Sequence, residues 1–156
     1  MKKLVGRGVV FLAGAASLTM PAPKPAAYEF TARLQDPRLS VLQRFFRALG
    51  CPALGYAPAF LEASDSFSLD WRLLPSLSFV ETTCGKAAKD NNLFGWDSGR
   101  ATFASPVAAI REVAERLSRS ARYQGKTLEQ KLALFNRTPG YGSQVKKTMR
   151  RIAPAE

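Results

Sequence analysis

The sequence contains no histidine and only two cysteines among its 156 residues. Without histidine, neither a Ser-His-Asp triad nor a Cys-His pair can be assembled. Two cysteines also fall short of the four nitrogen or sulfur ligands of a structural zinc site. Any hydrolytic chemistry must therefore rest on carboxylates, and we expect no metal or other cofactor.

Acidic residues are scarce, with 12 Asp and Glu against 23 Lys and Arg, a formal net charge of +11. Such a basic chain favours an anionic partner, for example a cell-wall polymer or a lipid surface. Nucleic acid fits the charge equally well but does not fit the exported location inferred below, so we expect no nucleic-acid partner. A hydrophobic content of 46% and 22% charged residues are typical of a globular chain, and the length suits one domain with a core of its own.

Long hydrophobic runs are also missing. The N-terminal apolar run, from Val9 to Met20, has about 12 residues, whereas a transmembrane helix needs roughly 20. It follows three basic residues and precedes a proline-rich stretch, a pattern typical of a secretory signal peptide. We therefore predict a signal peptide and Pro-rich spacer in residues 1–27 and a separate domain in residues 28–156.

This prediction implies export to the periplasm, the cell wall or the exterior, with no stable membrane span after processing. Cleavage at Ala27 would lower the formal charge from +11 to +7, because residues 1–27 carry Lys2, Lys3, Arg7 and Lys24 and no acid. The proline-rich stretch could instead remain as a short tether.

The two cysteines, Cys51 and Cys84, favour one disulfide in an oxidising compartment. In the chain-entropy model such a bridge stabilises the fold by roughly 3–4 kcal/mol. Two buried free thiols are the alternative.

Apolar residues recur at helical spacing along most of the chain, and strand signals are weak. The segment rich in Asn, Asp and Gly at residues 86–103 predicts a polar loop or a short hairpin. We thus expect a mostly α-helical domain. Helices are predicted from Pro37 to Leu49, from Pro58 to Phe67, from Trp71 to about Thr83, from Pro106 through Leu117, from Leu128 through Phe135, and after Gly140 through Ile152.

The last predicted helix has a basic face of Lys146, Lys147, Arg150 and Arg151. Such a face is most often solvated surface, and contact with an anionic polymer is the second interpretation.

Glu81 is placed unusually for a carboxylate. It continues the apolar face of Leu74 and Leu77 at spacings i, i+3 and i+7, and it lies in the last turn of its predicted helix. Apolar surroundings and a helix C-terminus both favour the neutral, protonated carboxyl, which is the form a general acid needs. The alternative is a side chain that merely bends out to solvent.

The segment Asn91–Trp96 follows this candidate acid closely and combines amides with aromatic rings. Sugar binding uses flat aromatic faces against pyranose rings and amides for hydroxyl or acetamido groups. Trp96 and Phe94 could supply the rings and Asn92 the amide. Alternatively, Phe94 and Trp96 are core residues that close the loop.

Three segments together resemble the glucosaminidase domain family (mannosyl-glycoprotein endo-β-N-acetylglucosaminidase-like, glycoside hydrolase family 73) of the lysozyme-like superfamily. They are Trp71–Pro75 with Phe79–Lys86, then Asn91–Trp96, then Phe135–Val145, in the order that the family shows. The resemblance runs from about Asp36 to Ile152. It implies a lysozyme-like helical domain in residues 28–156 with little or no β-lobe, and we expect this domain to be a monomer.

The resemblance also implies hydrolysis of the β-1,4 bond between N-acetylglucosamine and N-acetylmuramic acid in peptidoglycan. By position, Glu81 matches the catalytic acid, and the expected substrate-binding residues are Asn92, Phe94, Trp96, Asn136 and Tyr141. Glu81 is followed by Thr82-Thr83-Cys84, where Ser and an aromatic residue are commoner in the family. The second carboxylate of many members has no clear counterpart here, and Asp97 is our candidate.

With two carboxylates, an inverting glycosidase holds them about 6.5–9.5 Å apart, whereas a substrate-assisted one uses the acetamido group of the sugar as nucleophile and needs only Glu81. A lone acid also fits a lytic transglycosylase, which leaves an anhydro sugar. The missing second acid leaves a non-catalytic wall-binding module as a further alternative.

Overall fold

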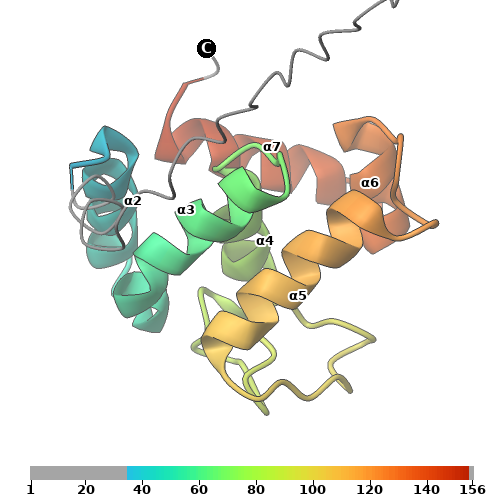
Figure 1. Cartoon of the computed structure of the whole chain (residues 1–156), viewed down its shortest axis with the longest axis horizontal. Helices are drawn as coiled ribbons and strands as arrows, with labels where there is room; N and C mark the ends of the chain where they lie inside the picture. The colour runs from blue at the N-terminus through green and yellow to red at the C-terminus, as the bar shows by residue number, and fades with distance from the viewer. Residues whose placement is uncertain (1–34, 155–156) are drawn as a thin grey trace, which may run out of the picture.

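A computed structural model describes residues 35–154 of the chain. The predicted signal peptide and spacer, residues 1–27, lie outside this range. The described part is mostly α-helical, as predicted, and contains no strand, so residues 86–103 form a loop without a hairpin (Figure 1). The helices are α2 (Pro37–Ala48), the short 3-10 helix η1 (Pro52–Tyr56), α3 (Ala57–Ser66), α4 (Leu73–Thr82), α5 (Pro106–Arg119), α6 (Leu128–Phe135) and α7 (Tyr141–Ile152).

Local capping explains where several of these helices begin. The Asp36 carboxylate accepts a hydrogen bond from the backbone N–H of Arg38 at 2.9 Å at the start of α2, and Ser105 Oγ accepts one from Ala108 at 3.1 Å at the start of α5. Thr127 and Gln130 form the predicted capping box of α6. Each cap satisfies backbone N–H groups that a helix cannot satisfy itself.

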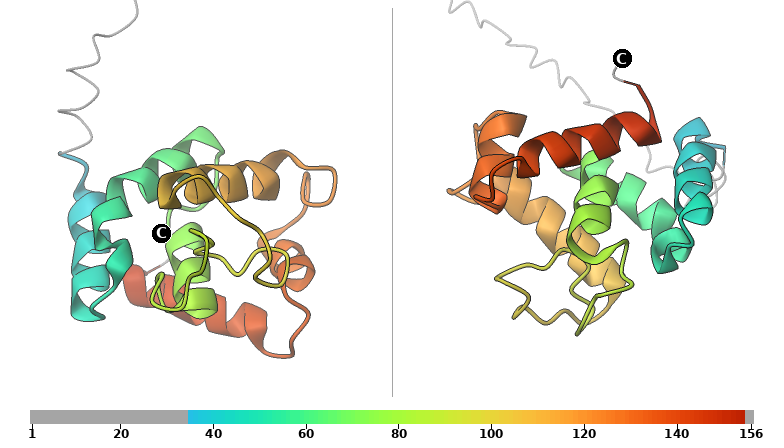
Figure 2. Two further views of the ribbon diagram at one scale, coloured as in Figure 1. Left: turned by 90° about the horizontal axis from the view of Figure 1, so that it is seen from below. Right: turned by 180° about the vertical axis from the view of Figure 1, so that it is seen from behind.

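Helix α4 lies at the centre of the molecule, with α2, α3, α5 and α7 around it (Figures 1 and 2). It packs most extensively against α7, while α3 packs against α5. Its side chains are buried from Leu73 through Ser78, which is nearly all round the helix. This position at the centre of the fold fixes the end of α4, where Glu81 lies.

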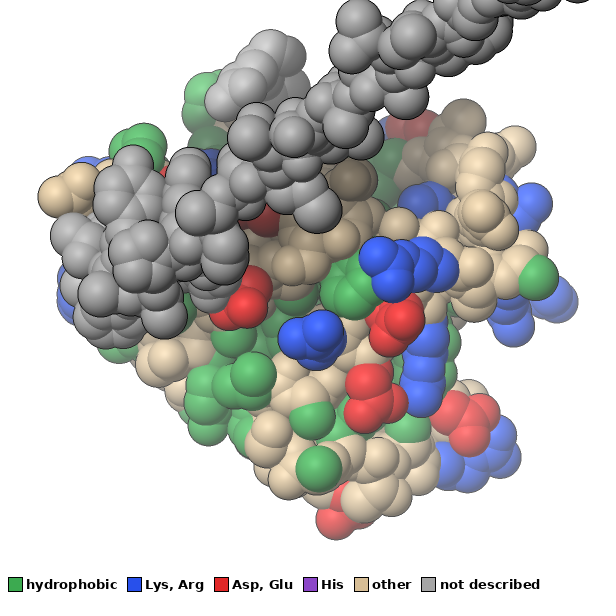
Figure 3. Space-filling model, in the orientation of Figure 1, with side chains coloured by type: hydrophobic (Ala, Val, Ile, Leu, Met, Phe, Trp, Pro, Cys, Tyr) green, Lys and Arg blue, Asp and Glu red, His purple; other side chains and the backbone are tan. Residues whose placement is uncertain are grey.

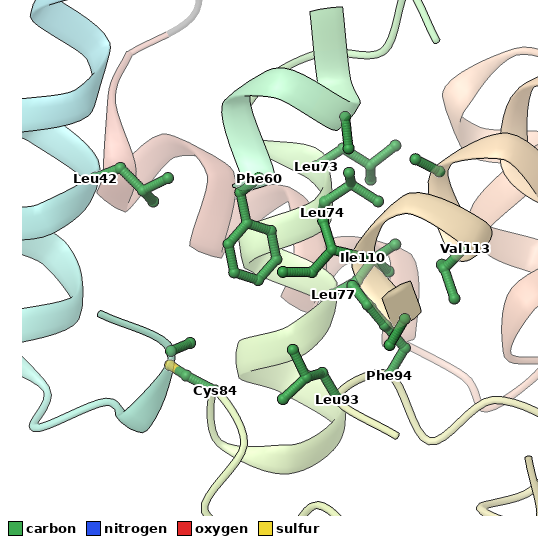
Figure 4. Close-up of a cluster of buried hydrophobic side chains, with 14 of the residues drawn as sticks. Leu42, Phe60, Leu73, Leu74, Leu77, Cys84, Leu93, Phe94, Ile110 and Val113 are labelled. Carbon is green, nitrogen blue, oxygen red and sulfur yellow. The ribbon is translucent and has the colours of Figure 1, made fainter. Parts of the chain in front are cut away.

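The core joins α4 to its neighbours and to the loop that follows it. Figure 4 shows Leu74 and Leu77 of α4 among Phe60 of α3, Ile110 of α5 and Phe94 of the loop. All five side chains are fully buried. Within residues 35–154, no helix combines the length and the apolar character that crossing a bilayer requires.

Candidate functional site

The C-terminal end of α4 is held firmly on two sides. Thr83 takes a left-handed conformation with φ 53°, and the helix closes with Thr83 N–H donating to Phe79 O and Cys84 N–H donating to Ser78 O. The predicted disulfide between Cys51 and Cys84 is present and connects this end to the turn after α2. Thr82 Oγ1 is 2.7 Å from Leu93 O, to which it donates a hydrogen bond. Glu81 therefore projects from a helix end that is tied to both α2 and the following loop.

Gly95 brings the loop backbone directly against the Glu81 carboxyl. Its φ is +57°, a conformation that glycine adopts without steric cost, and a β-carbon at this position would lie 2.9 Å from Glu81 Oε2. Only a residue without a side chain lets the backbone approach the carboxyl this closely.

Asn92 has a different role from the one predicted. Its side chain is buried, its amide nitrogen donates to Trp96 O at 3.0 Å, and its amide oxygen accepts from Trp96 N–H at 2.8 Å. Both ends of the amide are thus used within the loop. Asn92 shapes the turn that carries Trp96 and does not offer an amide to a ligand.

Phe94 also departs from the prediction. It is fully buried, and its ring packs edge-on against Phe60 with centroids 6.3 Å apart. The expectation that Phe94 stacks on a sugar is therefore wrong, and the alternative interpretation of Phe94 as a core residue is correct.

Trp96, by contrast, is half-buried and lines a cleft next to Glu81. Its ring meets Phe135 edge-on at 5.5 Å and Tyr123 at 6.2 Å between centroids. The guanidinium of Arg116, paired with Glu112 at 3.1 Å, lies 5.3 Å from the Trp96 ring centroid. These contacts fix the orientation of the indole, as a cation over an aromatic face does.

The cleft has a volume of about 500 Å³. One group of lining residues comes from α4 and the loop, namely Glu81 and residues 95–98, and the other group comes from Arg122, Tyr123 and residues 134–137 around α6. Of the predicted site residues, the structure brings Glu81, Trp96, Asp97 and Asn136 together here. Among residues 35–154, no group of acidic or sulfur side chains is arranged to hold a metal ion.

Tyr141 is buried and does not line the cleft. Its ring stacks on Phe135 with centroids 6.1 Å apart and planes 6° apart. Burial, and then the nearby Glu81 carboxyl, raise the pKa of the Tyr141 hydroxyl, so the hydroxyl keeps its proton at ordinary pH. The two groups interact, because the Tyr141 hydroxyl donates a hydrogen bond to the Glu81 carboxyl. Glu81 Oε1 and the Tyr141 hydroxyl oxygen are both buried and have no other hydrogen-bond partner among the described residues.

The Tyr141 hydroxyl and the Glu81 carboxyl thus form a buried pair beside the cleft. The Glu81 carboxyl therefore combines a fixed backbone, a tyrosine hydroxyl as its side-chain partner and access to the cleft.

Asp97 is the other carboxylate on the cleft among the described residues, and it lies in a different environment. Its side chain is exposed and forms an ion pair with Arg100 at 2.8 Å. The hydrogen bond from Arg100 holds the pKa of Asp97 below its usual range, so Asp97 is ionised at neutral pH. The two carboxyls thus differ: Glu81 is half-buried and paired with a tyrosine hydroxyl, whereas Asp97 is exposed and paired with an arginine.

Sequence reasoning missed Arg122, Tyr123 and Arg137 and noted Phe135 only as a departure from the family pattern. Tyr123 carried a usable signal, since it is a single aromatic residue in an otherwise polar connection between two helices. The two arginines carried none, because surface arginines are frequent in this basic chain.

A comparison of the chain with protein-family models, curated proteins and solved structures finds no match. Residues 35–154 define a helical domain with a half-buried glutamate that lines a cleft at the end of its central helix. The resemblance to the glucosaminidase domain family rests on the three sequence segments alone.

Proposed function

We propose that this protein is a peptidoglycan hydrolase of the endo-β-N-acetylglucosaminidase type, with Glu81 as its general acid. The observation that carries the proposal is the position of Glu81: its half-buried side chain lines the cleft, Gly95 backs Oε2, and the Tyr141 hydroxyl is its side-chain partner. A glutamate that is held on a cleft can act as a general acid toward a ligand atom.

In the proposed reaction, Glu81 protonates the glycosidic oxygen while the bond from that oxygen to the sugar C1 breaks. The acetamido oxygen of the same sugar attacks C1 and forms a cyclic intermediate. Water then opens this ring and returns its proton to Glu81. Trp96 supplies an aromatic face beside the acid. In an inverting alternative, the ionised Asp97 carboxylate would take a proton from a water that attacks C1 directly, without the cyclic intermediate.

The Cys51–Cys84 disulfide supports the export that peptidoglycan cleavage requires, since disulfides persist in oxidising compartments. We propose that residues 1–27 direct this export.

The test is Glu81→Gln, assayed for release of fragments from purified peptidoglycan by mass spectrometry. Because a positioned general acid contributes about 100- to 10,000-fold to rate, we expect release to fall at least 100-fold, with the melting temperature unchanged or higher. Glu115→Gln removes an exposed carboxylate from α5 and should retain full activity. Full activity of Glu81→Gln would overturn the assignment.

A non-catalytic wall-binding module is a second candidate, favoured by the pairing of Asp97 with Arg100, which leaves no unpaired second carboxylate on the cleft among the described residues. The same mass spectra separate the possibilities. New reducing ends on N-acetylglucosamine indicate the hydrolase, anhydromuramic ends a lytic transglycosylase, and the absence of release with retained wall binding the module.

A further inference from the structure

Two arginines, Arg122 and Arg137, lie on the Glu81 cleft without a carboxylate partner among the described residues. Five other arginines are paired with carboxylates, namely Arg38, Arg72, Arg100, Arg116 and Arg119. On the face shown in Figure 3, side chains of both signs alternate, and α5 pairs Arg116 with Glu112 and Arg119 with Glu115. The cleft arginines thus add positive charge where a ligand would bind.

Arg122 is held in position by the fold. One of its guanidinium nitrogens donates to Leu134 O at 2.8 Å, near the end of α6, and the guanidinium lies 5.7 Å from the centroid of the Tyr123 ring. A guanidinium has five N–H donors in a rigid plane, so this single bond leaves donors for a ligand carboxylate.

Arg137 is the second residue after the end of α6 and borders two hollows. The first is the Glu81 cleft, and the second, also about 500 Å³, is lined by Gly140, Ser143 and Lys146 of the turn into α7 and its first turns. Asn136 and Arg137 line both. A ligand longer than one or two sugars can therefore leave the cleft past Arg137, which suits a polymer.

The acidic side of the cleft does not cancel this charge. Asp97 is already paired with Arg100, which leaves Glu81 as the only other carboxylate lining the cleft within residues 35–154. A ligand that fills the cleft therefore meets two guanidinium groups, and an acidic group on the ligand gains from that contact while a neutral ligand does not.

From this arrangement we infer that Arg122 and Arg137 make the cleft selective for glycans that carry carboxylates, over neutral polymers of the same N-acetylated sugar. The inference rests on the proposed function for the identity of the ligand as a glycan, but the charge selection is a binding property and does not need turnover.

The test compares two tetrasaccharides of equal length by calorimetry, with mass spectrometry to verify that each stays intact. One is a peptide-free oligomer of alternating N-acetylglucosamine and N-acetylmuramic acid, with free lactyl carboxylates. The other is the neutral oligomer of N-acetylglucosamine. We expect the wild type to bind the acidic ligand more tightly, and each of Arg122→Gln and Arg137→Gln to lower this preference about threefold, the size expected of an exposed charge contact.

Three controls make the result specific. Arg150→Gln removes the same charge from an exposed position on α7 outside both hollows and should leave the preference unchanged. Arg122→Lys keeps the charge and should keep most of the preference, which separates charge from the structural bond to Leu134. Raising the salt concentration should reduce the wild-type preference, because salt screens exposed charges.

Equal affinity of the wild type for the two ligands, or an equal effect of Arg150→Gln, would overturn the inference. A wild type that selects the acidic ligand through these arginines but releases nothing from peptidoglycan supports the inference and contradicts the hydrolase. A wild type that cleaves peptidoglycan yet binds both ligands equally supports the hydrolase and contradicts the inference.

Discussion

Gly95 is the residue that most directly constrains Glu81 from outside its own helix. We expect Gly95→Ala to abolish peptidoglycan release, because the new methyl group would lie 2.9 Å from Glu81 Oε2 and must displace the carboxyl. The substitution also places alanine at φ +57°, which costs about 1–2 kcal/mol of folding free energy. Activity and urea unfolding measured on the same preparation report both effects.

Gly99 offers the matched control for this prediction. Its φ is +80°, but no atom lies within 4 Å of the position that a β-carbon would take. Gly99→Ala should therefore cost comparable stability through backbone strain and leave release of wall fragments intact. If both variants lose activity equally, strain in the loop and not contact with Glu81 is the cause.

The sequence alone could not predict which aromatic side chain of the loop is buried. Phe94 and Trp96 are two residues apart in a segment without helical or strand periodicity, so no pattern indicates which ring is buried. The structure buries Phe94 against Phe60 and leaves Trp96 at the cleft. Asn92 explains why the two rings differ in burial. Its side chain makes two hydrogen bonds to the Trp96 backbone, and these turn the chain between residues 92 and 96.

Helix α2 is coupled to α3 through charges at its first turn. Arg38 donates to the Asp36 carboxylate and makes two hydrogen bonds of 2.8 Å to Asp65 at the end of α3. The hydrogen bond from Arg38 holds the pKa of Asp36 below its ordinary value. A lowered folded-state pKa adds stability above the unfolded-state value of about 3.9, and this stability is lost as the pH falls through the folded-state pKa.

Asp36→Asn tests this coupling, because asparagine caps a helix about as well as aspartate but carries no charge. We expect the variant to be less stable than wild type at pH 7 by at most about 1 kcal/mol, since the pair is partly exposed. The difference should shrink below about pH 4 and vanish once Asp36 is protonated. Urea unfolding across this pH range measures it, and a difference that is constant with pH would contradict the role of the charge.

Elements whose bounds are encoded by neighbouring residues could be predicted from the sequence, whereas elements set by distant contacts could not. The starts of α2, α5 and α6 were predictable because each is encoded by a cap and its first turn, as in Ser105-Pro106 and the Thr127–Gln130 box. The path of residues 83–105 was not, because it depends on left-handed residues such as Asp90 and Asp97 and on contacts to α4 that are distant in sequence.

At the scale of the whole molecule, the cleft exists only because distant segments meet. Glu81 could be found from its own helix, whereas Arg122, Tyr123 and Phe135 reach it through the packing of α5, α6 and α7 around α4 (Figure 2). A side chain whose function depends on such packing carries little local signal. The candidate acid was therefore predictable and most of its surroundings were not.

The Cys51–Cys84 disulfide closes a loop with a sequence separation of 33 that contains η1, α3 and α4. In the chain-entropy model a loop of this length stabilises the fold by about 3–4 kcal/mol, a large part of the total stability of a small domain. We expect reduced wild-type protein to unfold at correspondingly lower urea concentration than oxidised protein. Reduction is the matched comparison because the side chains stay the same, whereas Cys51→Ala with Cys84→Ala also changes core volume. Titration of the unreduced, denatured protein should find no free thiol. Two titratable thiols, or equal stability of the two forms, would contradict the bridge.

Because Cys84 lies three residues after Glu81, reduction should also lower the rate of peptidoglycan cleavage at temperatures where the domain is still folded. An unchanged rate would show that packing of α4 alone positions the acid.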